Sequence, residues 1–143
     1  MIKQYRAGQC DPAVVMEAVK TAKIIRAGEL SEALVEIIDF VYYGGGRIGG
    51  TDGPMEEFFV VVDALSQIGL PAVDPIMTLL MKENIHSLKS QLGRRTIILI
   101  YDSNCVEYLE KRVAAVDEKK RGNLELQLAE LKREIPQSQP KFK

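Results

Sequence analysis

Residues that could carry out catalysis or bind a metal are few in this chain and lie far apart. His86 is the only histidine among the 143 residues. Beside Glu83 it could act as a general base or a metal ligand, but no second histidine, cysteine or acidic cluster stands at ligand spacing from it. We expect an exposed or capping histidine in a turn. The sequence predicts neither an enzyme nor a bound metal or cofactor.

The two cysteines, Cys10 and Cys105, are widely separated and form no C-x-x-C motif. Such a pair is typical of reduced thiols in a cytoplasmic protein. The N-terminus, MIKQYRAGQC, lacks the apolar centre of a secretory signal, and the apolar run 58–62 is far too short to span a membrane. We expect a cytoplasmic protein that contacts no membrane.

The segment Gly44–Gly53 has six glycines in ten residues and precedes a predicted helix, a context in which backbone amides can hold a phosphate. No lysine follows the glycines before Thr51 and no strand precedes them. Glu56 and Glu57 place negative charge at the helix start, where it would repel an anion. We therefore expect a flexible connection, with a flap that closes on a partner as the alternative.

Two basic clusters, Arg94–Arg95 and Lys119–Lys120–Arg121, could contact nucleic acid. The chain has no Trp and only 6% aromatic residues, which leaves few rings for base stacking. We expect solvated or ion-paired helix faces. Nucleic-acid binding is the alternative, and it requires these five side chains to converge on one surface.

Negative charge is concentrated in the middle of the chain. Residues 29–83 contain ten acidic and two basic residues, a net charge of −8, although the whole chain has a net charge of −1. This bias predicts a partner that carries Lys or Arg.

Apolar residues recur at intervals of three and four along most of the chain, which predicts helices throughout. The β-prone runs 60–62 and 97–100 lie inside longer helical patterns, so the expected fold class is all-α. We expect helix starts at Asp11, Ser31, Pro54, Pro71 and Ser103, and helix ends at Gly28, Gly44, Gly69 and Pro136. The patch 119–122 is expected to interrupt the path before a last helix. Residues 1–136 would form one domain, followed by a disordered tail, 137–143.

Pairs of these helices repeat. A shift of 33 residues aligns Gly69 with Asp102. A second alignment pairs Gly28 with Gly69 and allows one extra residue in the corner. It pairs Leu34 with Ile76. The offset of 33 also matches Leu65 with Ile98, Val73 with Val106, Ile76 with Leu109 and Leu80 with Val113. Three hairpins result, at 11–43, 54–83 and 86–117. Since one hairpin cannot bury its own apolar faces, stacking is expected.

The repeat resembles HEAT-type repeats, including the bacterial HEAT-like repeats related to phycobilisome lyases. The resemblance is carried by Ala64-Leu65, Ile68-Gly69, Pro71, Ala72-Val73, Pro75 and Leu79-Leu80. It implies a right-handed α–α superhelix of three hairpins with a C-terminal capping helix. Members of this family often have an Asp at the turn between repeats and an Arg at the start of the next helix, and these residues form a ladder along the stack. In this chain the pattern is weak, because the nearest candidates are Glu83 and Lys89.

In such a superhelix the second helix of each hairpin lines the concave face. The polar positions expected on that face are Glu32, Glu36, Asp39, Tyr43, Asp74, Thr78, Glu107 and Glu110. They predict a mostly acidic groove and a non-enzymatic protein-binding or scaffold module for a basic protein or peptide. A charged, solvated face without a partner is the alternative from the residues alone. A lyase-like accessory protein, with a pocket near Cys10 or Cys105, is the alternative from the resemblance.

Leu126 lies off the apolar stripe of the last helix. It is either an isolated exposed leucine or a contact in a homodimer formed through the C-terminal helix.

Overall fold

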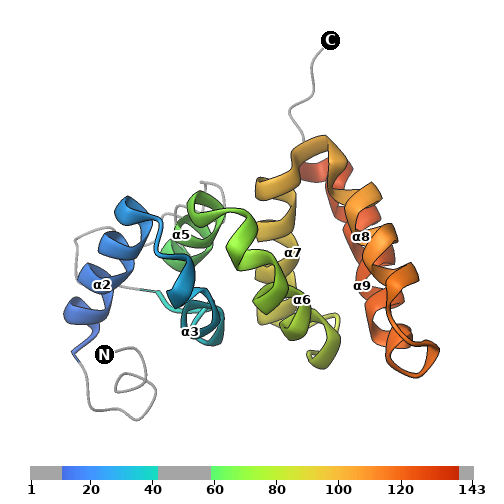
Figure 1. Cartoon of the computed structure of the whole chain (residues 1–143), viewed down its shortest axis with the longest axis horizontal. Coiled ribbons are helices and arrows are strands. Elements are labelled where there is room, and N and C mark those ends of the chain that lie inside the picture. Colours follow the sequence, from blue (N-terminus) through green and yellow to red (C-terminus); the bar gives the residue numbers. More distant parts are fainter. Residues whose placement is uncertain (1–10, 42–58, 139–143) are drawn as a thin grey trace.

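The computed structural model describes residues 11–41 and 59–138 of the chain, and this part is helical, with no strand. The helices lie along the longest axis, with α2 and α3 toward one end and α8 and α9 toward the other (Figure 1). The elements are α2 (Pro12–Ile25), η1 (Gly28–Leu30), α3 (Ser31–Glu36), α5 (Val60–Ile68), η2 (Leu70–Ala72), α6 (Val73–Lys82), α7 (Leu88–Tyr101), η3 (Asp102–Asn104), α8 (Cys105–Ala115) and α9 (Glu118–Ser138). The predicted all-α class is confirmed for these residues. The expected start at Pro54 and end at Gly44 lie outside them.

Two kinds of helix start occur. Asp11 caps α2 as expected, since its Oδ1 accepts a hydrogen bond of 2.8 Å from the amide of Ala13. Ser87 caps α7 in the same way. The caps expected at Ser31 and Ser103 are wrong, because a 3₁₀ turn leads into α3 and another leads into α8. These turns supply backbone hydrogen bonds where a side-chain cap would otherwise be needed.

The corners at Gly69 and Asp102 have nearly the same backbone conformation. Gly69 has φ 81° and ψ −133°, and Asp102 has φ 51° and ψ −124°. Each amide donates to the carbonyl four residues earlier, of Leu65 and Ile98 respectively. A 3₁₀ turn and a second helix follow both corners. The two corners are therefore equivalent under the offset of 33 residues.

Gly28 does not end α2, contrary to the expectation. Arg26 takes that place in the left-handed conformation, with φ 51° and ψ 54°. Gly28 begins η1 instead, where a Cβ atom would lie 2.9 Å from the Cβ of Pro71. A glycine at position 28 thus allows the first corner to touch the second.

α3 is shorter than the sequence indicates, because it ends at Glu36 rather than at Gly44. Ile37, Ile38 and Phe40, which follow it, are all buried. At about 100° per residue a continuing helix would place these three side chains within an arc of about 160°, on one face. The three side chains reach the core in the turn after α3 as well.

α9 is longer than expected at both ends. It begins at Glu118 and includes the basic patch 119–122, and it continues past Pro136 to Ser138. Pro136 falls in the last turn, where its missing amide removes one backbone hydrogen bond without breaking a long segment. The expected interruption at 119–122 and the expected end at Pro136 are both wrong.

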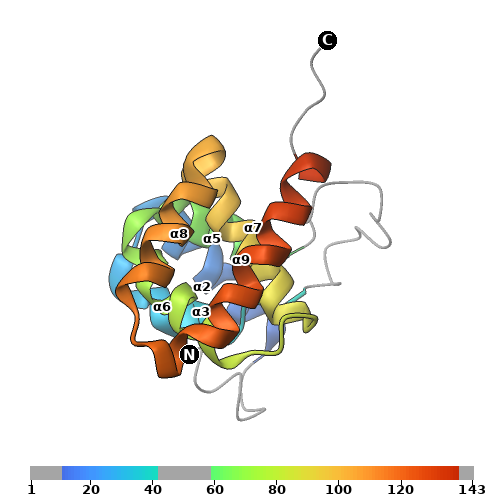
Figure 2. The same ribbon diagram turned by 90° about the vertical axis from the view of Figure 1, so that its right-hand side faces the viewer.

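The helices share one apolar core. α5 packs against α2, α3 and α7, and α6 packs against α3, α7 and α9. α9 also lies along α8, at the end of the molecule that faces the viewer in Figure 2. Fully buried side chains include Val15, Leu34, Leu65, Ile76, Leu92, Leu109 and Leu124. Within the described residues no single helix is long and apolar enough to cross a membrane, although Val60–Ile68 and Leu70–Lys82 together meet that criterion across a bend of 117°.

Replacing Asp102 with glycine is expected to stabilise the fold. A side chain at this positive φ costs about 1–3 kcal/mol, and glycine avoids that cost while losing about 0.5–1 kcal/mol in backbone entropy. Asp102→Gly should therefore raise the free energy of unfolding by about 1 kcal/mol, as measured by urea denaturation followed by circular dichroism. Asp102→Ala is the control, since it removes the carboxylate but keeps the Cβ atom. Equal stability of the two variants would contradict backbone strain.

Candidate functional site

A groove between α3 and α6 contains four of the eight expected site residues. Glu32 and Glu36 come from α3, and Asp74 and Thr78 come from α6. The groove has a volume of about 560 Å³. Its remaining lining residues are Val35, Pro75, Leu79, Lys82, Glu83 and Lys89.

The groove follows from the spacing of residues on α6. Asp74, Thr78 and Lys82 are four residues apart, so they lie on one face of the helix. The opposite face, including Ile76 and Leu80, is fully buried. Val35, Pro75 and Leu79 are the apolar members of the lining. The groove therefore combines a charged rim with an apolar surface.

The charged residues of the groove lining are four carboxylates and two lysines, Lys82 and Lys89, which give a net charge of −2. Lys89 Nζ donates a hydrogen bond of 3.3 Å to the backbone oxygen of Glu36. Arg112 of α8 reaches Asp74 with an Nη1–Oδ1 distance of 2.8 Å. Lys82 could have been found from its spacing to Thr78, but Arg112 has no local signal in the sequence.

The other expected residues do not line this groove. Asp39 is exposed in the turn after α3. Glu107 and Glu110 are exposed on α8, and Glu107 pairs with Lys111 one turn away. Tyr43 lies outside the described residues.

Beyond Asp74, Arg112 also lies over the ring of Tyr108, 6.0 Å from its centroid. That ring stacks on Tyr101, with 4.1 Å between the centroids. Burial, followed by hydrogen bonding with Tyr101, raises the pKa of Tyr108 to about 12. The phenol therefore stays neutral at physiological pH, and the pair serves to hold α7 against α8.

Arg94 is buried and ion-paired, so it is not part of the basic surface that the nucleic-acid alternative requires. Its side chain is about 2% exposed, and its Nε and Nη2 donate to the two carboxylate oxygens of Glu134 at 2.8 and 2.9 Å. Its Nη1 donates to the backbone oxygen of Ile85 at 2.9 Å and also to Gln127. Four of the five N–H donors of this guanidinium thus have acceptors inside the protein, two of them in a bidentate pair with α9.

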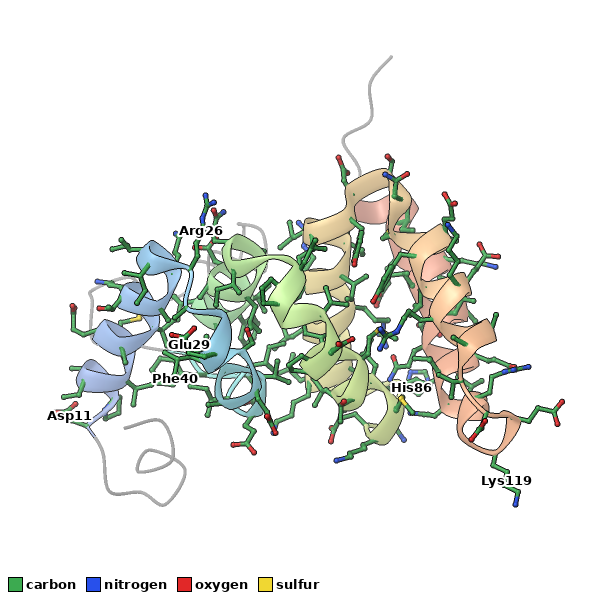
Figure 3. The ribbon with its side chains drawn as sticks, in the orientation of Figure 1. Asp11, Arg26, Glu29, Phe40, His86 and Lys119 are labelled. Atoms are coloured by element: carbon green, nitrogen blue, oxygen red, sulfur yellow. The ribbon has the colours of Figure 1, made fainter. Side chains whose placement is uncertain are left out.

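The remaining basic residues do not join Arg94 on one surface. Arg121 Nη2 donates to the carbonyl of Val116 at 3.0 Å, at the end of α8. Figure 3 shows Lys119 at the start of α9, pointing away from the other helices. Arg95 is half-buried, and the side chain of Lys120 lies outside the description. The convergence that nucleic-acid binding requires is therefore not found among the described side chains.

Two amide side chains of α9 hold the end of α6. Asn123 Nδ2 donates to the carbonyls of Leu80 and Glu83, both at 2.8 Å. Gln127 Nε2 donates to the carbonyl of Leu80 at 3.0 Å and to Ser90 Oγ at 2.9 Å. The last carbonyls of a helix lack partners inside the helix, and here α9 supplies them. The segment that carries Lys82 and Glu83 is thereby fixed.

The residues with potential for catalysis lie outside the groove. His86 is exposed in the turn between α6 and α7, and its amide donates to Asn84 Oδ1 at 2.8 Å (Figure 3). Cys105 is fully buried, and burial raises the pKa of its thiol. Cys10 lies outside the described residues. Among those residues no group of three or more metal-ligating side chains is present.

Leu126 is 53% exposed on α9, as expected.

Comparison of the chain with models of protein families, with curated proteins and with solved structures found no match. The resemblance to HEAT-type repeats therefore rests on the residues of the chain alone.

Removing Glu134 should destabilise the protein more than removing the whole ion pair. Glu134→Ala leaves the buried guanidinium of Arg94 without its carboxylate, at an expected cost of about 3 kcal/mol. Replacing both residues, as Arg94→Met/Glu134→Leu, should recover at least half of that loss. Urea denaturation of the two variants and the wild type measures the difference. A double variant less stable than Glu134→Ala would contradict this account.

The thiol of Cys105 should react slowly in the folded protein. Its burial and raised pKa both disfavour the reactive thiolate. In a Cys10→Ser variant, modification by a disulfide reagent should be roughly 100-fold slower in buffer than in 8 M urea. Comparable rates would show an accessible thiol, as the lyase-like alternative requires.

Proposed function

We propose that this protein is a non-enzymatic interaction module of the cytoplasm, which binds a segment of a partner protein in the groove between α3 and α6. One observation carries the proposal: the second helices of the first two hairpins, α3 and α6, line the same groove. Their outward-facing residues in its lining are Glu32, Glu36, Asp74 and Thr78. Residues far apart in sequence thus form one surface with both charged and apolar members.

We also propose that the helices form a HEAT-like superhelix. Support comes from the matching corners at Gly69 and Asp102 and from the contact between Gly28 and Pro71. The first helices α2, α5 and α7 pack in sequence, and the second helices α3 and α6 pack on each other. The third hairpin departs from the pattern, since α9 takes the main position beside α6. In this proposal α9 is the capping helix.

Binding in this groove would depend on a surface that is already ordered. The end of α6 is fixed by Asn123 and Gln127, and its buried face packs in the core. Little conformational entropy is then lost by the protein on association. Because the groove carries four carboxylates and two lysines, the partner's basic groups would contribute to affinity, and salt would weaken it.

The alternatives have less support. Nucleic-acid binding would use Arg94, whose donors are taken up by Glu134, Gln127 and Ile85. A lyase-like role would use a reachable cysteine, whereas Cys105 is fully buried.

Selection from a displayed library of random twelve-residue peptides tests the proposal. Peptides selected by the wild-type protein should be enriched in Lys and Arg. They should bind the groove variant Glu32→Lys/Glu36→Lys at least tenfold more weakly in low salt, because two attractive charges become repulsive. Fluorescence polarisation measures both affinities.

The control is Glu107→Lys/Glu110→Lys, which makes the same charge change on α8 outside the groove and should keep wild-type affinity. Equal binding by the groove variant and the wild type would remove the groove from the function.

A further inference from the structure

We infer that the groove distinguishes the two ends of its ligand: it fits an extended peptide segment with Lys or Arg at one end and Asp or Glu at the other, about four residues apart. This inference rests on the proposed function and gives the partner segment a defined charge pattern.

The helices that form the groove run in the same direction. Their starts are adjacent, because Gly28, just before α3, approaches Pro71, just before α6. Their ends are also adjacent, because Lys89, shortly after α6, donates to the backbone oxygen of Glu36, the last residue of α3. The groove therefore has one end at the two helix starts and the other end at the two helix ends.

The charges are distributed unequally between these ends. Glu32 and Asp74 lie in the first turns of α3 and α6, and the lining has no lysine there. Both lysines, Lys82 and Lys89, lie at the opposite end, where α6 ends and α7 begins. Arg112 approaches Asp74 from α8, but in an exposed pair that a competing cation can replace at small cost.

The end with the lysines also contains two carboxylates, so its net charge is zero, against −2 at the helix starts. Glu83 accepts a hydrogen bond from Ser87 Oγ at 3.2 Å, and Glu36 lies within the groove lining. Lys89 Nζ makes its hydrogen bond to a backbone carbonyl, and Lys82 makes no ion pair with any described carboxylate. Two ammonium groups are thus placed where a ligand carboxylate can accept hydrogen bonds from them, while at the other end it would meet Glu32 and Asp74.

The length of the groove fixes the spacing of the ligand charges. Asp74 and Lys82 are eight residues apart on one helix face, which corresponds to about 12 Å. An extended chain covers this distance in about four residues. α3 and α6 pack directly on each other, so the groove between them is narrower than a helix, which is about 10 Å wide. A segment that enters the groove is therefore extended.

Between the charged ends, the apolar residues of the lining determine the middle of the ligand. Val35, Pro75 and Leu79 offer no charged group for a polar side chain to pair with. Small apolar residues at the central positions would cover this surface and exclude water from it. The expected pattern is thus a cation, a short apolar stretch and an anion, in one of the two chain directions.

Four short peptides, acetylated and amidated at their ends, test the pattern: Lys-Ala-Val-Ala-Glu, its reverse Glu-Ala-Val-Ala-Lys, and the two forms with Lys at both ends or Glu at both ends. Each is titrated into the ¹⁵N-labelled full-length protein, and amide shifts of groove residues are followed. One of the two mixed-charge peptides is expected to bind about tenfold more tightly than either like-charged peptide.

A variant of the protein in which charges are exchanged between the two ends of the groove tests the same pattern. Glu32→Lys/Lys82→Glu keeps the net charge but moves the more acidic end of the lining from the helix starts to the helix ends, so the preferred mixed-charge peptide should change to its reverse. The control, Glu125→Lys/Lys132→Glu, makes the same exchange at exposed positions of α9 and should retain the preference. Circular dichroism verifies that both variants fold.

The possible outcomes separate this inference from the proposed function. If the peptide with two lysines binds as tightly as the better mixed-charge peptide, the groove takes basic segments without regard to an anion, and the inference is overturned while the proposed function stands. Absence of groove shifts with all four peptides overturns the inference as well. The library selection then decides the proposed function independently.

Discussion

The buried guanidinium of Arg94 holds together the segments that the groove requires. A buried guanidinium is stable only when its N–H groups have hydrogen-bond acceptors. For Arg94 these acceptors include the carboxylate of Glu134 and the carbonyl of Ile85. The first contact brings α9 against α7, and the second fixes the turn after α6. With α9 in that position, Asn123 and Gln127 reach the open carbonyls of α6. The position of one groove wall thus follows from the burial of one charge.

The other wall depends on apolar packing instead. α3 is short, and the residues after it, Ile37, Ile38 and Phe40, are buried in the core. Burial of apolar surface is not directional. This packing therefore fixes how close α3 lies to the core better than it fixes the rotation of α3 about its own axis. The hydrogen bond from Lys89 to the end of α3 adds a directional contact between the two walls. The groove therefore joins a wall held by polar contacts to one held by packing.

Local rules in the sequence predicted the helices and failed where distant contacts decide. The cap at Asp11 and the corner at Gly69 depend on neighbouring residues, and both were predicted correctly. Asp102 matched Gly69 by periodicity alone. The burial of Arg94 could not be predicted, because its partner Glu134 is 40 residues away and no local pattern joins them. The same limit hid Arg112, which reaches Asp74 from another hairpin.

The contact between Gly28 and Pro71 has a consequence for the groove that begins beside it. These two residues set how closely the first two hairpins approach at their corners. A methyl group at position 28 would push the corners apart, and the first hairpin would pivot about its packing with α5. The starts of α3 and α6 would then separate. The width of the groove would thus depend on a hydrogen atom of a residue outside its lining.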